Sequence, residues 1–214
     1  MIKLHGYFRS SASYRVRIAL NLKGLAYEYR AVHLTRGGGE QFAPAFRELN
    51  PLSVVPVLED DETRVTQSLA IIEYLDEVHP EPPLLPRNAA ARARVRSLAL
   101  SVACELHPLN NLRVLAYLTR ELGVSDEAKN DWYRHWVALG LSALESEIAH
   151  GLPGRFCHGD EPGLADCFLI PQLFNARRFD CELSGYPRLL AIERSCCALP
   201  AFRDAAPGRQ PDAE

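Results

Sequence analysis

The sequence predicts two domains of different class: a small α/β domain over residues 1–80 and an all-helical domain over residues 89–214. Short strand-like runs alternate with short helical patterns up to residue 80, whereas only helical patterns follow residue 88. Three prolines fall within residues 81–86, so residues 81–88 are predicted to be a linker. A chain of 214 residues is long enough for one large domain or two small ones.

In the first domain, residues 2–7 and 27–32 have the alternation of strands. Residues 11–23 carry one apolar helical face and end at Gly24, which is typical of a helix stop. Two short runs, 55–58 and 64–66, flank an acidic turn and predict a hairpin. With a helix between the second and third strands and another over residues 68–78, the predicted order is β-α-β-α-β-β-α.

The second domain is predicted to contain four helices. The first is long and periodic. The predicted helices cover residues 89–122, 126–150, 165–179 and 187–197. Residues 207–214 have the composition of a polar tail. Trp132, Tyr133 and Trp136 recur at helical spacing and are predicted to be packing residues.

The composition excludes several classes of protein. A hydrophobic fraction of 47% and a charged fraction of 24% are ordinary for a soluble globular chain. The net charge of −3 argues against a nucleic-acid-binding domain, which is usually basic. We expect no membrane span, since no run of about 18 apolar residues occurs. The N-terminus lacks the pattern of a signal peptide, and the six cysteines lack metal-ligand spacing, so we expect a cytoplasmic protein with reduced thiols and no metal site.

The loop between the first strand and the first helix is the first candidate site, because ligands of α/β sheets bind at the carboxyl ends of strands. Ser10 and Ser11 lie there, at a helix N-terminus whose unpaired amides favour an anion or a thiolate. The structural alternative is that either serine is only a helix cap. Val55-Pro56 is a second candidate ligand site, since a cis bond there would expose backbone groups to a ligand. The structural alternative is that Pro56 is an ordinary proline of an edge strand.

The third candidate site is Gln67-Ser68. The Ser68 amide would face an anion at the start of the following helix, or Ser68 would simply cap that helix.

Residues 10–20 read Ser-Ser-Ala-Ser-Tyr-Arg-Val-Arg-Ile-Ala-Leu. This segment resembles the zeta-class glutathione transferase signature, Ser-Ser-Cys-x-x-Arg-Val-Arg-Ile-Ala-Leu. Further family motifs follow in order: Asn50-Pro51, Val55-Pro56, residues 67–75, residues 107–111 and residues 164–166.

Within that class, the chain is most similar to the maleylacetoacetate and maleylpyruvate isomerases. The resemblance covers nearly the whole chain. It implies a thioredoxin-like N-terminal domain that binds glutathione, followed by an all-α C-terminal domain that shapes the substrate pocket, assembled as a homodimer. The implied activity is glutathione-dependent cis–trans isomerisation of a maleyl keto-diacid, in the catabolism of aromatic compounds.

The resemblance also implies roles for individual residues. Ser10 matches the serine near the glutathione sulfur, with Ser11 beside it, and Val55 matches the residue whose backbone pairs with the cysteinyl part. Gln67 and Ser68 match the pair at the γ-glutamyl end, and Gln41 a residue near the glycyl end. Arg178 matches a substrate-binding arginine.

Two positions depart from the family pattern. Ala12 replaces the usual cysteine, which puts in doubt a protein thiol beside glutathione but not activation by Ser10. Gly163 stands where the family has Ser or Thr, three residues before Asp166, and supplies no side-chain oxygen. We expect a structural role for Asp166 at that helix start.

The implied reaction indicates further candidate residues. A dicarboxylate needs fixed cationic partners, which arginine provides bidentately. Arg9, Arg113 and Arg178 are the candidates, with Arg9 and Arg178 also assigned catalytic roles. His107 and Asn111 are four residues apart, so they are predicted to share a helix face and orient the substrate, or to be structural.

Two alternative functions remain open at this point. The same thiolate chemistry would serve a transferase that conjugates or dehalogenates small halogenated acids. A non-catalytic, protein-binding module of the same fold is the other alternative, although it need not keep Ser10, Gln67, Ser68 and the arginines together.

Overall fold

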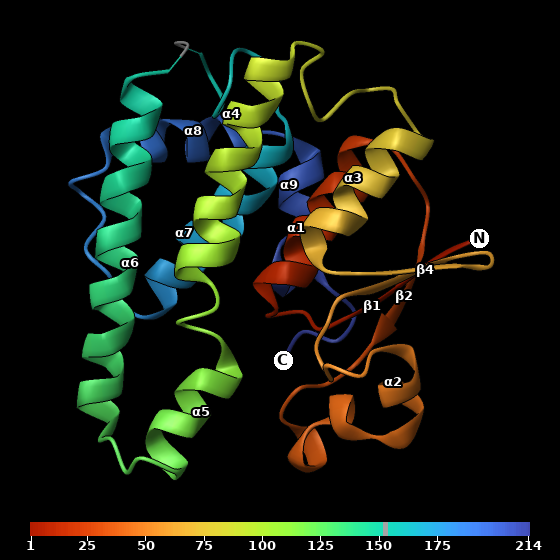
Figure 1. Ribbon diagram of the computed structural model, residues 1–214, viewed down its shortest axis with the longest axis vertical. Helices are drawn as coiled ribbons and strands as arrows, with labels where there is room; N and C mark the ends of the chain where they lie inside the picture. Colours follow the sequence, from red (N-terminus) through yellow and green to blue (C-terminus); the bar gives the residue numbers. More distant parts are fainter. Residues whose placement is uncertain (152–153) are drawn as a thin grey trace. The chain divides into compact units, whose positions relative to one another are not determined.

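The computed structural model describes residues 1–151 and 154–214, which divide into two compact units (Figure 1). The first unit comprises Met1–Leu84 together with Cys197–Glu214, and the second comprises Leu85–Cys196. Among the described residues, no helix is both long enough and apolar enough to cross a bilayer.

The first unit contains a four-stranded mixed sheet in the order β2-β1-β3-β4. Its strands are β1 (Ile2–Gly6), β2 (Glu28–Ala31), β3 (Val57–Asp60) and β4 (Thr63–Thr66). β1 runs parallel to β2 and antiparallel to β3, while β3 and β4 form the predicted hairpin. This sheet and its helices confirm the predicted α/β domain.

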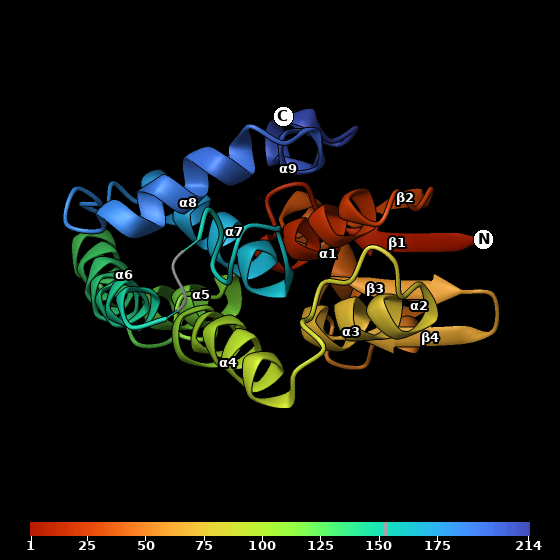
Figure 2. The same cartoon turned by 90° about the horizontal axis from the view of Figure 1, so that it is seen from above.

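Four α-helices belong to the first unit, all of whose residues the structure describes. They are α1 (Ser11–Leu22), α2 (Pro44–Leu49), α3 (Ser68–Val78) and α9 (Pro200–Ala205). α1 packs against α3 and also against α9, which comes from the far end of the chain (Figure 2). α2 is the helix expected between the second and third strands, so the predicted order of elements up to α3 is confirmed.

Local sequence sets both ends of α1. The Ser10 side chain caps its N-terminus, and Gly24, with a φ of 65°, follows the C-cap residue Lys23. The Leu25 amide donates to the Leu20 carbonyl at 3.0 Å, which closes the last turn. A left-handed residue at this position is most easily supplied by glycine, as the sequence predicted.

The C-terminal segment packs with the first unit, although the sequence placed it in the helical domain of residues 89–214. The buried Arg17 guanidinium donates to the Ala205 carbonyl at 2.9 Å. The Phe8 amide donates to the Asp212 carboxylate at 3.0 Å. Residues 207–214 are therefore held by specific hydrogen bonds and are not a detached polar tail.

The predicted linker is also anchored at its start. The Lys23 ammonium group lies in the interior, where it pairs with Asp76 at 2.8 Å and donates to the His79 and Pro82 carbonyls. Leu84 is buried and its amide donates to Asp76. Buried lysine is rare unless it is paired in this way, and here it ties residues 76–84 to the end of α1.

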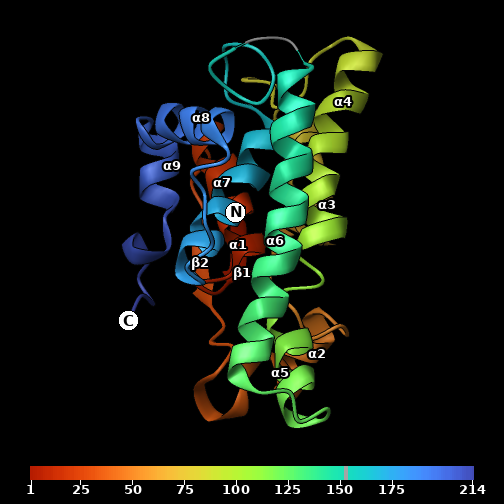
Figure 3. The ribbon, with the colours of Figure 1, turned by 90° about the vertical axis from the view of Figure 1, so that its left-hand side faces the viewer.

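The second unit is helical throughout its described elements (Figure 3). The segments are α4 (Ala89–Leu100), a π-helical turn (Ser101–Leu106), α5 (Leu112–Arg120), α6 (Asp126–Ala149), α7 (Leu164–Arg178) and α8 (Pro187–Cys197). The predicted helices over 126–150, 165–179 and 187–197 are confirmed to within a residue. Tyr133 is buried and stacks on Phe179 with ring centroids 3.6 Å apart, as expected of a packing residue.

The single helix predicted over residues 89–122 is wrong. The backbone widens into a π turn, in which the His107 amide bonds the Val102 carbonyl, five residues back. Pro108 has no amide with which to continue the helix. A new helix then starts at Leu112, capped by the Asn111 side chain.

Asp166 has the structural contacts expected of it. Its carboxylate is buried and accepts hydrogen bonds from the Gly163 and Cys157 amides, each at 2.9 Å. Gly163 has no side chain to return the bond, so only the acidic half of a capping box is present. Burial raises the pKa of Asp166 above its usual range.

Candidate active site

Ser10 lies between β1 and α1 and is the N-cap residue of α1. The Ser13 amide donates to Ser10 Oγ at 3.2 Å, so the oxygen acts as the acceptor in the cap. The hydroxyl proton then remains to be given to another group. Ser10 is half-buried at the N-terminus of a 12-residue helix, whose unpaired amides and dipole favour a thiolate.

Ser11 and Ala12 follow Ser10 as the first residues of α1, and both are buried. The methyl group of Ala12 occupies the position at which the signature has a cysteine. All six cysteines of the chain lie between residues 104 and 197, far from this turn in the sequence. The side chains of this turn therefore provide hydroxyl groups but no thiol.

Val55 precedes β3, and the Val55–Pro56 peptide bond is cis, which was one of the two alternatives left open by the sequence. The turn before it is braced by Asn50. The Asn50 amide nitrogen donates to the Val54 carbonyl at 2.7 Å, and its oxygen accepts from the Leu52 amide at 3.1 Å. This turn fixes the backbone that leads into Val55.

Gln67 and Ser68 form the start of α3. The structure excludes the alternative in which Ser68 caps this helix: Gln67 is the N-cap residue, with a φ of 70°, and Ser68 is the first helical residue. The Ser68 amide is consequently one of the helix donors that have no intrahelical acceptor. Its buried hydroxyl oxygen accepts a bond from Arg15 at 3.2 Å. Amide, hydroxyl and helix dipole together favour a carboxylate.

Gln41 is buried beside the glycine-rich loop. Its Nε2 donates to the Leu34 carbonyl at 3.3 Å, while its Oε1 is buried without a hydrogen-bond partner among the described residues. Gly39 has a φ of 110°, and a Cβ there would come within 2.6 Å of the Gln41 amide group. Glycine therefore leaves room for this side chain.

Arg9 is exposed, next to Ser10, and is held by Tyr7. Its Nε and Nη2 donate to the Tyr7 hydroxyl at 3.2 and 2.9 Å. Its guanidinium also lies 5.2 Å from the centre of the Phe8 ring. These contacts restrict the side chain while leaving its cationic group at the surface.

The remaining predicted residues belong to the second unit. His107 and Asn111 do not share a helix face, because His107 ends the π turn and Asn111 is the N-cap of α5. The Asn111 side chain accepts from the Arg113 amide at 3.0 Å, so its oxygen is used in capping. Arg113 is exposed in the first turn of α5, and Arg178 is exposed at the end of α7.

Sequence reasoning missed three residues that support these groups. Tyr7 holds Arg9, Arg15 holds Ser68, and Trp132 donates from Nε1 to the Leu109 carbonyl at 3.0 Å beside the His107 turn. Arg15 and Arg17 carried a signal, since two arginines fall among apolar helix positions that are otherwise buried. Tyr7 and Trp132 were visible only as apolar residues of a strand and a helix.

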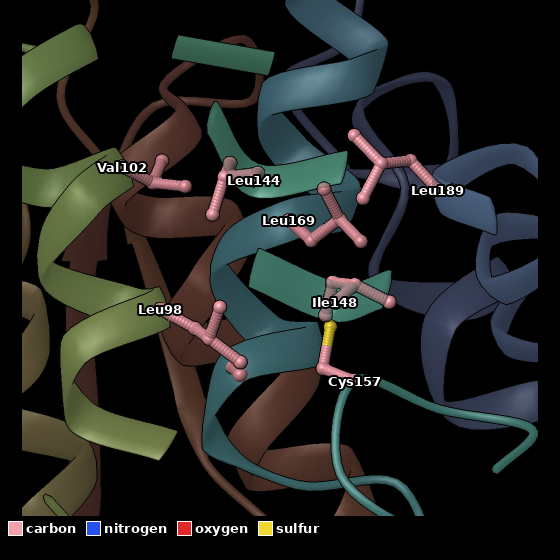
Figure 4. Close-up of a pocket in the computed structure, with 8 residues that line it drawn as sticks. Leu98, Val102, Leu144, Ile148, Cys157, Leu169 and Leu189 are labelled. Carbon is pink, nitrogen blue, oxygen red and sulfur yellow. The ribbon is translucent and has the colours of Figure 1, made fainter. Parts of the chain in front are cut away.

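A small cavity of about 10 Å³ lies inside the second unit (Figure 4). Its lining is apolar apart from one thiol and consists of Leu98, Val102, Leu144, Ile148, Cys157, Ala165, Leu169 and Leu189. This volume holds at most about one water molecule. The cavity is therefore a packing defect of the helical core, unsuited to a charged substrate.

Comparison with known proteins identifies the family. Residues 4–83 match the profile of the glutathione S-transferase N-terminal domain, and residues 130–192 match that of its C-terminal domain. The chain is 55% identical over 210 residues to a probable maleylacetoacetate isomerase of Vibrio cholerae, covering 98% of this chain and 97% of the relative. The chain belongs to the glutathione S-transferase family.

Solved structures agree with this assignment and place the chain in the zeta class. A holo maleylpyruvate isomerase, a bacterial zeta-class glutathione S-transferase, has 47% identity and a TM-score of 0.96, covering 99% of this chain and 100% of that one. A maleylacetoacetate isomerase of Methylobacterium extorquens AM1 with bound malonate and glutathione has 42% identity and a TM-score of 0.95, covering 99% of both chains. The thioredoxin-like and all-helical domains of the zeta-class fold are thus confirmed.

Proposed function

We propose that this chain is a glutathione-dependent cis–trans isomerase that converts maleylpyruvate or maleylacetoacetate to the fumaryl isomer in the catabolism of aromatic compounds. The observation that carries the proposal is the arrangement of Ser10 and Ser68. Each presents a hydroxyl group at a helix N-terminus, and each hydroxyl accepts a bond from the protein and so can donate to a ligand. Relatives that keep the same domains over the whole chain are isomerases by name.

Other residues of the first unit fit glutathione. Gln41 lies beside the glycine-rich loop and matches the family residue near the glycyl end of the tripeptide. We propose that Ser10, Ser11, Gln41, Val55, Gln67 and Ser68 hold glutathione. The related structure from Methylobacterium extorquens contains glutathione together with malonate, a dicarboxylate.

When bound, glutathione supplies the sulfur nucleophile that adds reversibly to the cis double bond. Ser10 donates its hydroxyl proton toward the sulfur and lowers the thiol pKa from about 8.5, because a hydrogen bond to the charged form favours that form. The α1 dipole acts in the same direction. The substrate carboxylates are held by Arg9, Arg113 and Arg178. The substrate is oriented by His107 and Asn111.

We further propose a homodimer in the cytoplasm, where glutathione is kept in its thiol form. Large apolar side chains of α4 and α5 support self-association, because Leu100, Leu112 and Tyr117 are 37–57% exposed in the single chain. Light scattering of the purified protein tests the dimer directly.

Turnover tests the activity. Purified protein is assayed with maleylpyruvate and with maleylacetoacetate, with and without glutathione, and glutathione binding is measured by calorimetry. We expect isomerisation of at least one keto-diacid, only when glutathione is present. Binding of glutathione without turnover of either substrate would instead support a transferase or a binding module. Turnover without glutathione would refute the role of the thiol.

A further inference from the structure

Arg15 is a buried charged residue in the first unit, on α1. Its side chain is 2% exposed, although arginine is almost never fully buried unless its donors are used. Its Nη1 lies 3.2 Å from Ser68 Oγ, at the first residue of α3. The bond joins two helices that pack against each other, and it ends on a residue proposed to bind glutathione.

The direction of this bond determines what Ser68 can do. A guanidinium group has donors only, so the Ser68 oxygen must be the acceptor. The hydroxyl proton of Ser68 is therefore left to donate elsewhere. The Ser68 amide, as the first of the helix, has no intrahelical acceptor either. Because Arg15 occupies the hydroxyl oxygen as acceptor, Ser68 can donate from both its hydroxyl and its amide, and two donors suit a carboxylate.

Arg17, two residues later on the same helix, provides a contrast. It is also buried, and burial lowers its pKa. Its guanidinium donates to three backbone carbonyl groups, those of Tyr7, Phe8 and Ala205. Arg17 therefore ties backbone segments together, whereas Arg15 orients a side chain of the ligand site.

We propose that Arg15 is a positioning residue for the γ-glutamyl carboxylate of glutathione: it fixes the Ser68 hydroxyl as a donor and adds a positive charge behind it. The inference rests on the proposed function, since it needs glutathione to bind at Ser68. Arg15 does not touch the ligand in this scheme and acts through Ser68.

The test compares two ligands in calorimetry with the full-length protein. One is glutathione, and the other is glutathione with its γ-glutamyl α-carboxylate converted to a carboxamide. In Arg15→Met we expect the glutathione Kd to rise about 10- to 100-fold, as for the loss of a charge-assisted hydrogen bond. The Kd of the carboxamide should rise less than about threefold, because that ligand lacks the charge. Ser68→Ala should add little to Arg15→Met, since both act on one hydroxyl group.

Arg15→Lys keeps the charge but not the planar fork, so it should recover part of the affinity and discrimination. It also serves as the test if Arg15→Met does not fold, which circular dichroism of each variant will show. If either variant binds both ligands more weakly by the same factor, the proposal is wrong and Arg15 has a structural role. The proposal is also wrong if the variants bind glutathione as tightly as the wild-type protein does. If wild-type protein binds no glutathione, the proposed function itself is wrong. Glutathione binding by the wild-type protein therefore tests the proposed function, and the loss of affinity in the Arg15 variants tests the role of Arg15.

Discussion

The carboxylate of Asp212 accepts a hydrogen bond from the backbone amide of Phe8, with the two atoms 3.0 Å apart and the residues 204 positions apart in the sequence. Asp212 also accepts from the Tyr29 hydroxyl at 3.3 Å. The C-terminal segment thereby binds the strand end that leads into Ser10. The loop carrying the proposed catalytic serine thus depends on the last residues of the chain.

Asp212→Ala should therefore lower the free energy of unfolding by about 1–2 kcal/mol, the value of hydrogen bonds to a partly buried charged group. Urea unfolding measures the change. Asp204→Ala is the control, because Asp204 is exposed on the adjacent helix α9. If the two variants lose equal stability, the Phe8–Asp212 bond does not hold this segment.

Ser10→Ala should lower turnover by about 10²-fold, as for a lost donor to developing charge. The thiol pKa of bound glutathione should rise at the same time, as followed by the ultraviolet absorbance of the thiolate. Ser10→Thr keeps both the hydroxyl and the cap and should retain most of the activity.

Loss of a helix cap could by itself reduce activity, and Ser125→Ala controls for this. Ser125 caps α6 with the same geometry, its Oγ accepting from the Ala128 amide at 3.2 Å. That variant should lose stability but not turnover. Near wild-type turnover in Ser10→Ala would show that the helix amides alone activate the thiol.

Thiol reagents should leave activity largely intact, because Ala12 stands in place of the cysteine of the signature. Cys104 and Cys197 are exposed and should react first, while Cys157, Cys167 and Cys196 are buried. Burial raises the pKa of Cys157, which makes its thiolate scarcer still. Mass spectrometry after timed alkylation identifies the labelled residues. Inactivation that glutathione prevents would instead place a reactive cysteine near the site.

Local signals made much of the first unit predictable from the sequence. Ser10 as a cap, Gly24 as a helix stop and the acidic turn between β3 and β4 each follow from residues within one turn of the chain. The helices from α6 to α8 were predictable for the same reason, since their apolar periodicity is strong.

Long-range contacts made the rest unpredictable. The π turn at Ser101–Leu106 keeps an apolar pattern that is indistinguishable from that of an α-helix, so the helix was extended through it although Pro108 is a local signal for a break. Nothing near Asp212 indicates that it binds Phe8. Likewise, Arg15 and Tyr7 serve the candidate site only through partners that the fold brings to them.

Tyr7→Phe removes only the hydroxyl that holds Arg9. We expect KM for the keto-diacid to rise about 3- to 10-fold with a smaller change in kcat, since freeing the arginine costs ordering entropy on binding. Tyr74→Phe is the control, because it removes a tyrosine hydroxyl that donates to Asp60 at 3.0 Å in the same unit, and it should change neither constant. An unchanged KM in Tyr7→Phe would show that Arg9 is ordered by other contacts or does not bind substrate.

Arg178→Ala tests the proposed carboxylate partner in the second unit. Arg178 is exposed at the end of α7, with its guanidinium 5.6 Å from the centre of the Phe179 ring. Loss of a bidentate pair to a substrate carboxylate should cost about 2–4 kcal/mol of transition-state binding. At 1.4 kcal/mol per decade, kcat/KM should fall roughly 30- to 1,000-fold. Arg178→Lys keeps the charge without the fork and should recover only part of this loss.

The neighbouring residue offers a matched control, because Arg177 lies in the same helical turn and pairs with the half-buried Glu193 at 2.6 Å. Arg177→Ala should leave kcat/KM within about threefold of wild type, as for most exposed ion pairs. Glutathione affinity, measured by calorimetry, should stay near wild type in every Arg178 variant, since the residues proposed to bind glutathione all lie in the first unit. If Arg178→Ala also changes kcat/KM less than about threefold, Arg178 is a surface residue like its neighbour. If it weakens glutathione binding as much as it lowers kcat/KM, its role is in the protein structure and not in holding the substrate.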